Sequence, residues 1–107
     1  MNRNNWEFSG ELFRLNEFDS GEFGASLRIR GSSRRFGVAT QICELTSLVP
    51  EELYYGEFRR RKVEQYDNIT VQGHIETWTK ERNSRVSTKA MFIVDTLVEV
   101  KKKGVRA

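Results

Sequence analysis

The stretch Asp67-Asn68-Ile69-Thr70-Val71-Gln72-Gly73-His74-Ile75-Glu76-Thr77-Trp78 decides the fold of this chain. From Ile69 to Glu76 apolar or small side chains alternate with polar ones, which is the period of a β-strand with one buried face. The pattern therefore predicts a strand that ends at Trp78. Residues 79–87 are polar and charged, and they predict a long loop after that strand.

The same alternation recurs elsewhere in the chain. It predicts strands that begin at Trp6, at Ala25, at Phe36 and at Thr88. Gly10 lies within the first of them and predicts a bend or a bulge. Residues 19–24 have the composition of a turn, and residues 31–35 predict a short basic turn. Pro50, followed by two glutamates, predicts the start of a short helix.

Three strands, a helical segment and two further strands fit into about 100 residues. This order predicts an all-β fold, a five-stranded OB-fold barrel with a short helix between strands 3 and 4. We expect residues 1–100 to form this single domain and residues 101–107 to be a basic C-terminal tail. A six-stranded SH3-like barrel is the alternative, because a hydrophobic pattern does not fix strand pairing.

The charge of the chain is unevenly distributed. The 107 residues carry a net charge of +3. Residues 1–53 hold six basic and eight acidic side chains, whereas residues 54–107 hold twelve basic and seven acidic ones. A basic second half indicates one positively charged surface, for which a polyanion is the natural partner.

Catalytic residue types are scarce. The chain has one histidine, His74, and one cysteine, Cys43, which we expect to be buried and inert. A zinc site needs three or four ligands, mostly Cys and His, and no phosphate-binding glycine motif is present. We therefore expect a non-catalytic binding protein with no cofactor and no metal. The chain has no apolar run of about 20 residues and no apolar opening segment, which predicts a cytoplasmic protein without membrane association.

Two groups of side chains are candidates for nucleic-acid binding. Arg28 and Arg30 face outward on the second strand, unless they form salt bridges with Glu7 or Glu11 on the first. Trp78 stands where the charged loop begins, although it could instead cap the end of the barrel. The full set of candidates is Arg28, Arg30, Arg34, Arg35, Trp78, Lys80, Arg82, Arg85, Phe23 and Phe13. Arginine and lysine neutralise phosphates, and aromatic rings stack on bases.

Residues 6–100 resemble the single-stranded DNA-binding protein family. The likeness rests on the opening strand with its central glycine, on the Val71-Gln72-Gly73 strand that leads to an aromatic residue, and on the closing run 92–100. The resemblance implies single-stranded DNA binding in replication, recombination or repair. It also implies a homodimer or homotetramer, with replication or recombination proteins as further partners.

The chain departs from the family in two respects. It ends in lysine and arginine rather than in an acidic tail, as expected of a tail-less phage, mobile-element or primosomal form. The connection between the second and third strands is expected to be short. Single-stranded RNA is a variant of the expected ligand. The alternative from another class is an OB-fold protein-interaction module, an adaptor or inhibitor in a larger assembly whose basic face meets an acidic partner.

Overall fold

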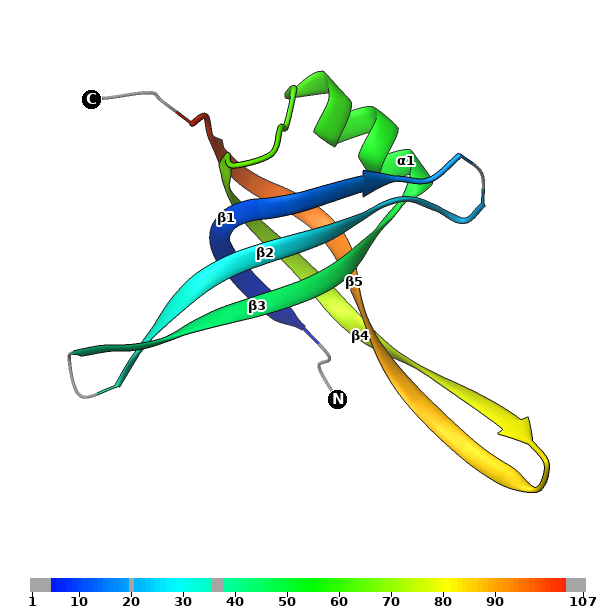
Figure 1. The fold of residues 1–107 in the computed structure, drawn as a ribbon. Helices are drawn as coiled ribbons and strands as arrows, with labels where there is room; N and C mark the ends of the chain where they lie inside the picture. Colours follow the sequence, from blue (N-terminus) through cyan, green and yellow to red (C-terminus); the bar gives the residue numbers. More distant parts are fainter. Residues whose placement is uncertain (1–4, 20, 36–37, 104–107) are drawn as a thin grey trace.

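The computed structural model describes residues 5–19, 21–35 and 38–103, with side chains outside the description at 32–42. Five strands and one short helical segment form the molecule (Figure 1). In chain order the elements are β1 (Trp6–Glu17), β2 (Phe23–Arg35), β3 (Val38–Pro50), α1 (Glu51–Leu53), η1 (Tyr54–Phe58), β4 (Asn68–Arg82) and β5 (Arg85–Lys101). The predicted all-β order, with the helix between the third and fourth strands, is confirmed.

The strands close into a barrel in the order β1-β2-β3-β5-β4. Strand β1 makes this closure possible because it pairs with two neighbours in succession. Its residues from Trp6 to Glu11 pair with β4, and those from Glu11 to Glu17 pair with β2. A parallel contact between Leu48 of β3 and Ile93 of β5 completes the ring. The five-stranded barrel is therefore confirmed over the six-stranded alternative.

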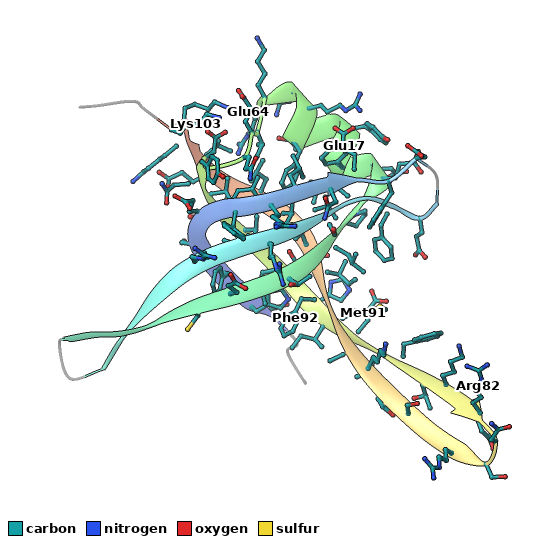
Figure 2. The ribbon with its side chains drawn as sticks, viewed as in Figure 1. Glu17, Glu64, Arg82, Met91, Phe92 and Lys103 are labelled. Carbon is teal, nitrogen blue, oxygen red and sulfur yellow. The ribbon has the colours of Figure 1, made fainter. Side chains whose placement is uncertain are left out.

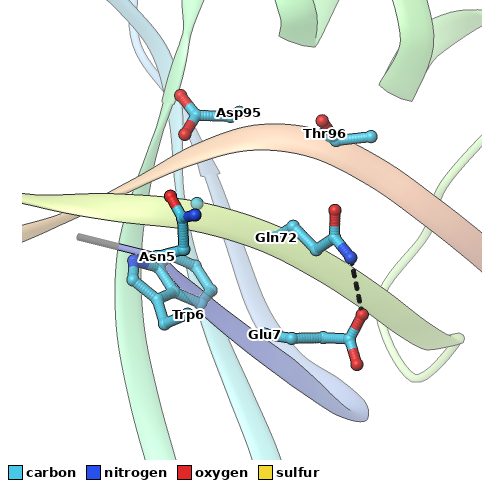
Figure 3. A pocket seen from close by; sticks show the side chains of 7 residues that line it. Asn5, Trp6, Glu7, Gln72, Asp95 and Thr96 are labelled. Atoms are coloured by element: carbon cyan, nitrogen blue, oxygen red, sulfur yellow. Dashed lines mark hydrogen bonds between the residues drawn. The ribbon is translucent and has the colours of Figure 1, made fainter. Parts of the chain in front are cut away.

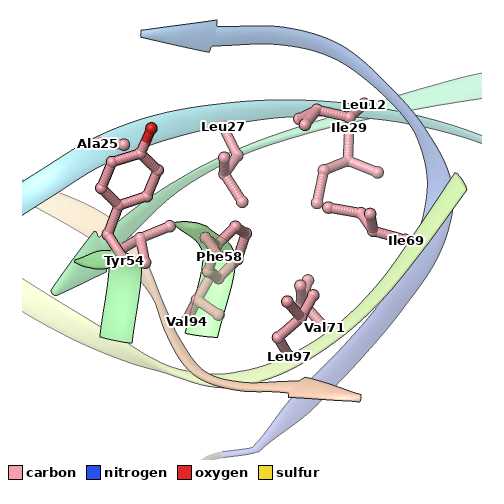
Figure 4. Close-up of a cluster of buried hydrophobic side chains, with 11 residues drawn as sticks. Leu12, Ala25, Leu27, Ile29, Tyr54, Phe58, Ile69, Val71, Val94 and Leu97 are labelled. Atoms are coloured by element: carbon pink, nitrogen blue, oxygen red, sulfur yellow. The ribbon is translucent and has the colours of Figure 1, made fainter. Parts of the chain in front are cut away.

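Alternating apolar residues of the strands fill the barrel (Figure 4). The predicted inward residues Ala25, Leu27 and Ile29 are at most 1% exposed. From β4, Ile69 and Val71 join them, and Phe58 of η1 closes the core from one end. Removal of this apolar surface from water is the main term that stabilises the barrel.

Two glycines allow the strands to approach closely. A Cβ added at Gly10 would lie 2.4 Å from the carbonyl oxygen of Arg30. The next residue, Glu11, is where β1 changes its pairing partner from β4 to β2. A Cβ at Gly73 would lie 1.9 Å from the carbonyl oxygen of Ile93. Strand β1 is strongly curved (Figure 1), and its bulge lies beyond Gly10, between Leu12 and Arg14.

Two expected loops are strands instead. Residues 31–35 continue β2 and pair with β3 as far as Arg35 and Val38, so the predicted short basic turn is wrong. Residues 79–87 form the end of a long hairpin, and only Asn83 and Ser84 make its turn. Both turn residues have positive φ, 52° and 63°, as a two-residue type I′ hairpin requires. The molecule therefore projects two β-arms away from the barrel (Figure 1).

The helical segment follows Pro50 directly, with no side-chain cap. It is anchored to the barrel by Tyr54, whose hydroxyl donates to a carboxylate oxygen of Glu17. Burial, together with this hydrogen bond, raises the pKa of Tyr54 to about 12. In the described ranges, no helix is long and apolar enough to cross a membrane.

Asp67 attaches the C-terminal lysines to the barrel, and its carboxylate is fully buried. Its oxygens accept hydrogen bonds from Lys102 Nζ over 2.6 Å and from the Lys103 backbone amide over 3.0 Å. Lys103 Nζ also lies 3.8 Å from Glu64, beside which it is seen in Figure 2. The first lysines of the basic C-terminal segment therefore contact the loop that precedes β4.

Candidate nucleic-acid interface

The β4–β5 arm, residues 76–82 and 85–91, carries one basic face. In an antiparallel pair, directly opposed residues project from the same side of the sheet. Trp78 lies opposite Lys89, Lys80 opposite Ser87, and Arg82 opposite Arg85. The residues of this basic arm face are therefore Trp78, Lys80, Arg82, Arg85, Ser87 and Lys89. The other face of the arm holds Thr77, Thr79, Glu81, Val86, Thr88 and Ala90.

Every side chain of the basic arm face is solvent-exposed. Trp78 is 50% exposed, and its ring contacts Lys80 with 5.8 Å between Nζ and the ring centroid. The structure therefore differs from the alternative in which Trp78 caps the barrel. Arg82 lies near the arm's tip, far from the barrel (Figure 2).

The four cations of the basic arm face are Lys80, Arg82, Arg85 and Lys89. Within the described residues, none of them has a carboxylate at salt-bridge distance. Successive like-facing residues on a strand lie about 6.8 Å apart. The arm thus presents a ladder of positive charges without carboxylate partners among the described residues, beside a half-exposed indole ring. Cations and an accessible ring are the two features that bind a flexible polyanion with stacked bases.

A second basic surface lies on the barrel wall, on the outer face of β1, β2 and β3. Arg28 and Arg30 face outward there, as predicted. Their salt-bridge partner is neither Glu7 nor Glu11, the two residues considered from the sequence. Glu44 of β3 pairs with both arginines instead, because β3 places it directly opposite Arg30.

Phe13 joins this surface through the bulge of β1. The bulge between Leu12 and Arg14 turns two consecutive side chains, Phe13 and Arg14, away from the core. The Arg30 guanidinium carbon lies 4.0 Å from the centroid of the Phe13 ring. We call Phe13, Arg14, Arg28, Arg30 and Glu44 the wall cluster. A hollow of about 200 Å³ lies beside it, lined by Arg14, Arg28 and Thr46 among others.

The wall cluster and the basic arm face lie on the same side of the sheet. Leu48 is the outer-face partner of Ser26 on β2, and it also pairs with Ile93 of β5. Ile93 in turn lies opposite His74, from which every second residue of β4 leads to Trp78. The outer face therefore continues from the wall to the arm, with His74 and Glu76 lying between the two basic surfaces.

Three other candidate residues are placed differently from the prediction. Phe23 does not lie in a loop: it begins β2 opposite Pro50 and is half-buried. The backbones of Arg34 and Arg35 belong to β2 rather than to a turn. Their side chains lie outside the described residues, so their role stays a prediction.

The hollow near the chain's start has the opposite charge. Its walls include Trp6, Glu7 and Asp95, and its volume is about 480 Å³ (Figure 3). Asp95 also binds Nδ1 of His74, while Glu76 binds Nε2 over 2.6 Å. These two hydrogen bonds, that to Glu76 first, raise the pKa of His74. Carboxylates repel phosphates, so this part of the surface is unsuited to a nucleic-acid backbone.

Most of the basic residues 59–62, at the end of the helical segment, form ion pairs with glutamates. Arg59 pairs with Glu17, and Arg60 and Arg61 pair with Glu57. Tyr55 is 40% exposed and lies under Arg59, with 4.6 Å between the guanidinium carbon and the ring centroid. These arginines are therefore less available to phosphates than those of the arm.

Sequence reasoning missed two residues that lie on these basic surfaces, Lys89 and Arg14. An Asn-Ser turn read as a hairpin would have paired Lys89 with Trp78, whereas no local signal marks the bulge that exposes Arg14. Cys43 is half-buried rather than buried. Among the described residues, no three His, Cys, Asp or Glu side chains are grouped so as to hold a metal ion.

No protein-family model matches the chain, and no curated protein matches it in sequence. Solved structures do match. A mitochondrial single-stranded DNA-binding protein of S. cerevisiae superposes with a TM-score of 0.63 at 17% identity, over 97% of this chain and 100% of that one. A small single-stranded DNA-binding protein of Mycoplasma pneumoniae gives 0.57 at 11% identity, over 98% and 99%.

A third match is the Plasmodium falciparum protein solved in complex with single-stranded DNA. It gives a TM-score of 0.59 at 11% identity, over 92% of this chain and 97% of that one. The chain thus has the OB fold of single-stranded DNA-binding proteins over nearly its full length.

Proposed function

We propose that this protein binds single-stranded DNA without catalysing a reaction on it, in replication, recombination or repair. One observation carries the proposal: the basic arm face joins an exposed tryptophan to four cations that have no acidic partner among the described residues. The cations would neutralise phosphates, and Trp78 would stack on a base. The wall cluster would supply the second contact through Phe13, Arg28 and Arg30.

A single strand fits this surface better than a duplex. Stacking on Trp78 requires a base whose face is open, and a duplex hides its base faces. A ladder of cations along a narrow β-arm suits a backbone that bends to follow it. Single-stranded RNA would fit the same surface. We propose DNA because the fold resembles that of proteins that bind single-stranded DNA.

A fluorescence titration tests the proposal. The whole protein is titrated with oligo-dT, oligo-rU and a duplex of equal length, at two salt concentrations. We expect oligo-dT to quench the tryptophan emission, the duplex to have little effect, and the affinity to fall steeply with salt. Equal, weak responses to all three polymers at low salt would contradict single-strand binding and favour the protein-interaction module.

A Trp78→Phe variant is the control for the source of the signal. The other tryptophan, Trp6, is half-buried, and its indole Nε1 donates to the His74 carbonyl oxygen over 2.9 Å. We therefore expect the variant to keep binding oligo-dT but to lose most of the quenching.

We include a homodimer or homotetramer in the proposal. Register with β2 begins only at Glu11, so within the described residues β1 from Trp6 to Gly10 has register partners in β4 alone. An unpaired strand edge of this kind supports association with another strand. Size-exclusion chromatography with light scattering measures the mass in solution. A monomer at micromolar concentration would contradict this part of the proposal and leave DNA binding untouched.

A further inference from the structure

Glu44 stands inside the proposed DNA-binding surface, although its charge opposes DNA. Its carboxylate accepts a hydrogen bond from Arg30 over 2.9 Å and lies 3.8 Å from Nε of Arg28. The side chains of all three residues are between 37% and 46% exposed, so solvent and a ligand can both reach them. The hydrogen bond from Arg30 lowers the pKa of Glu44, which keeps the carboxylate ionised at neutral pH.

The same arginine also covers the aromatic ring of the wall cluster. The Arg30 guanidinium carbon lies 4.0 Å from the Phe13 ring centroid, which is the geometry of a cation–π contact. Arg30 is thus held between a carboxylate and a ring face. Both means of binding DNA on the wall, its charge and its stacking surface, are already engaged within the protein.

The arm offers a contrast in the same molecule. Its four cations have no acidic partner among the described residues, and its tryptophan is half exposed. On the wall, β3 brings the carboxylate of Glu44 directly opposite Arg30. The described residues give the cations of the arm no such carboxylate, so the arginines of the wall are paired and the cations of the arm are not.

We propose that Glu44 is a built-in competitor of DNA, which holds Arg28 and Arg30 until a phosphate replaces its carboxylate. The inference rests on the proposed function and adds to it a residue that regulates affinity at the same site. DNA would engage the free cations of the arm first. The wall arginines would then exchange Glu44 for phosphate, and the released carboxylate would return to water. The exchange weakens binding and favours strands long enough to reach both surfaces.

The test compares the whole protein with Glu44→Gln and with Glu57→Gln. Both substitutions remove one negative charge, and both remove an ion-pair partner of two arginines. Glu57 lies on the helical segment, outside the proposed surface. We expect Glu44→Gln to bind a labelled oligo-dT about threefold to tenfold more tightly at low salt, and Glu57→Gln to bind almost as the unchanged protein does.

A double-mutant cycle links the effect to the two arginines. In an Arg28→Gln/Arg30→Gln background, the Glu44→Gln change should tighten binding clearly less than it does in the unchanged protein. Only direct repulsion between the Glu44 carboxylate and phosphate is then removed, because the carboxylate no longer pairs with either arginine. Thermal unfolding of each variant verifies that it is folded.

The outcomes separate the two claims. Binding by the unchanged protein with no gain in Glu44→Gln, or an equal gain in Glu57→Gln, would overturn the role of Glu44 alone. Absence of oligo-dT binding by the unchanged protein and by Glu44→Gln would overturn the proposed function, and the competitor with it.

Discussion

Trp78 of β4 lies directly opposite Lys89 of β5, so the indole ring and the ammonium group leave the same face of the arm. The two residues are separated by a turn with positive φ at both positions, Asn83 and Ser84. That turn fixes the register of the whole arm. It therefore determines which side chains stand beside Trp78, and the proposed DNA contact depends on a pairing far from the barrel core.

Replacement of Trp78 by alanine should weaken oligo-dT binding about tenfold or more. The reason is the loss of one stacked base, which costs about 1–3 kcal/mol in proteins of this kind. The folded structure should survive, because Trp78 is 50% exposed and is not part of the core cluster. Fluorescence anisotropy of a labelled oligonucleotide measures the affinity.

Thr79→Ala is the matched control for the tryptophan variant. Thr79 is the next residue of β4 and projects from the other face of the arm, opposite Thr88. Its loss should leave the affinity nearly unchanged. Equal losses of affinity in both variants would mean that the substitutions disturb the structure of the arm, and that Trp78 does not stack on a base.

Neutralisation of a cation on the arm should change the salt dependence of binding. Each phosphate contact contributes about 0.7 to the slope of log affinity against log salt for a single strand. Arg82→Gln, Arg85→Gln and Lys89→Gln should therefore each lower the slope by about that amount. Titrations at four salt concentrations give the slopes.

Arg60→Gln serves as the comparison for these variants. Arg60 is exposed, like the cations of the arm, but is paired with Glu57 on the helical segment. Its loss changes the net charge equally, yet should leave the slope in place. A decrease in the salt slope as large as that of the arm variants would mean that DNA also contacts the helical segment.

The barrel could be predicted from the sequence because its strands have one buried face. Ala25, Leu27 and Ile29 alternate with polar residues, and water exclusion turns that local period into a strand with a defined inner side. The outward direction of Arg28 and Arg30 follows from the same period. Their partner Glu44 does not, because cross-strand register depends on residues far apart in the chain.

The arms could not be predicted in the same way. All residues from Thr79 to Ser87 are exposed, so no apolar alternation marks them as strand. Their composition is that of a polar loop, which is how the pattern predicted residues 79–87. What holds them is backbone pairing across a tight turn, and Asn83 was the available signal, since asparagine tolerates positive φ better than most residues.

Asp67→Asn should lower the free energy of unfolding by about 1–3 kcal/mol. The Asp67 carboxylate is fully buried and accepts three hydrogen bonds, from Lys102 Nζ and from the backbone amides of Glu64 and Lys103. The amide side chain loses the charge and can keep only part of these bonds. Glu64→Gln is the control, because Glu64 contacts the same lysines but is 60% exposed.

The Asp67 contribution should also depend on pH. Burial favours the neutral acid, but the hydrogen bonds from Lys102, Lys103 and Glu64 outweigh it and lower the pKa of Asp67. Stability from this group is therefore complete above the ordinary value of 3.8 and is lost as the pH falls through the lower pKa of the folded state. Urea unfolding between pH 2 and pH 7 should show the difference between the unchanged protein and Asp67→Asn shrink in acid. A constant difference would contradict the assignment.

His74 provides a direct titration, because it is the sole histidine of the chain. Hydrogen bonds to Glu76 and Asp95 favour the charged imidazolium and raise its pKa above the ordinary 6.5. The associated stability is present below 6.5 and is lost as the pH rises through the higher folded value. NMR of the imidazole ring should therefore give a midpoint above 6.5, which Glu76→Gln and Asp95→Asn each lower. Glu81→Gln, on the other face of the arm, is the control and should leave the midpoint unchanged. A midpoint at or below 6.5 in the unchanged protein would mean that Glu76 and Asp95 do not bind the imidazole ring in solution.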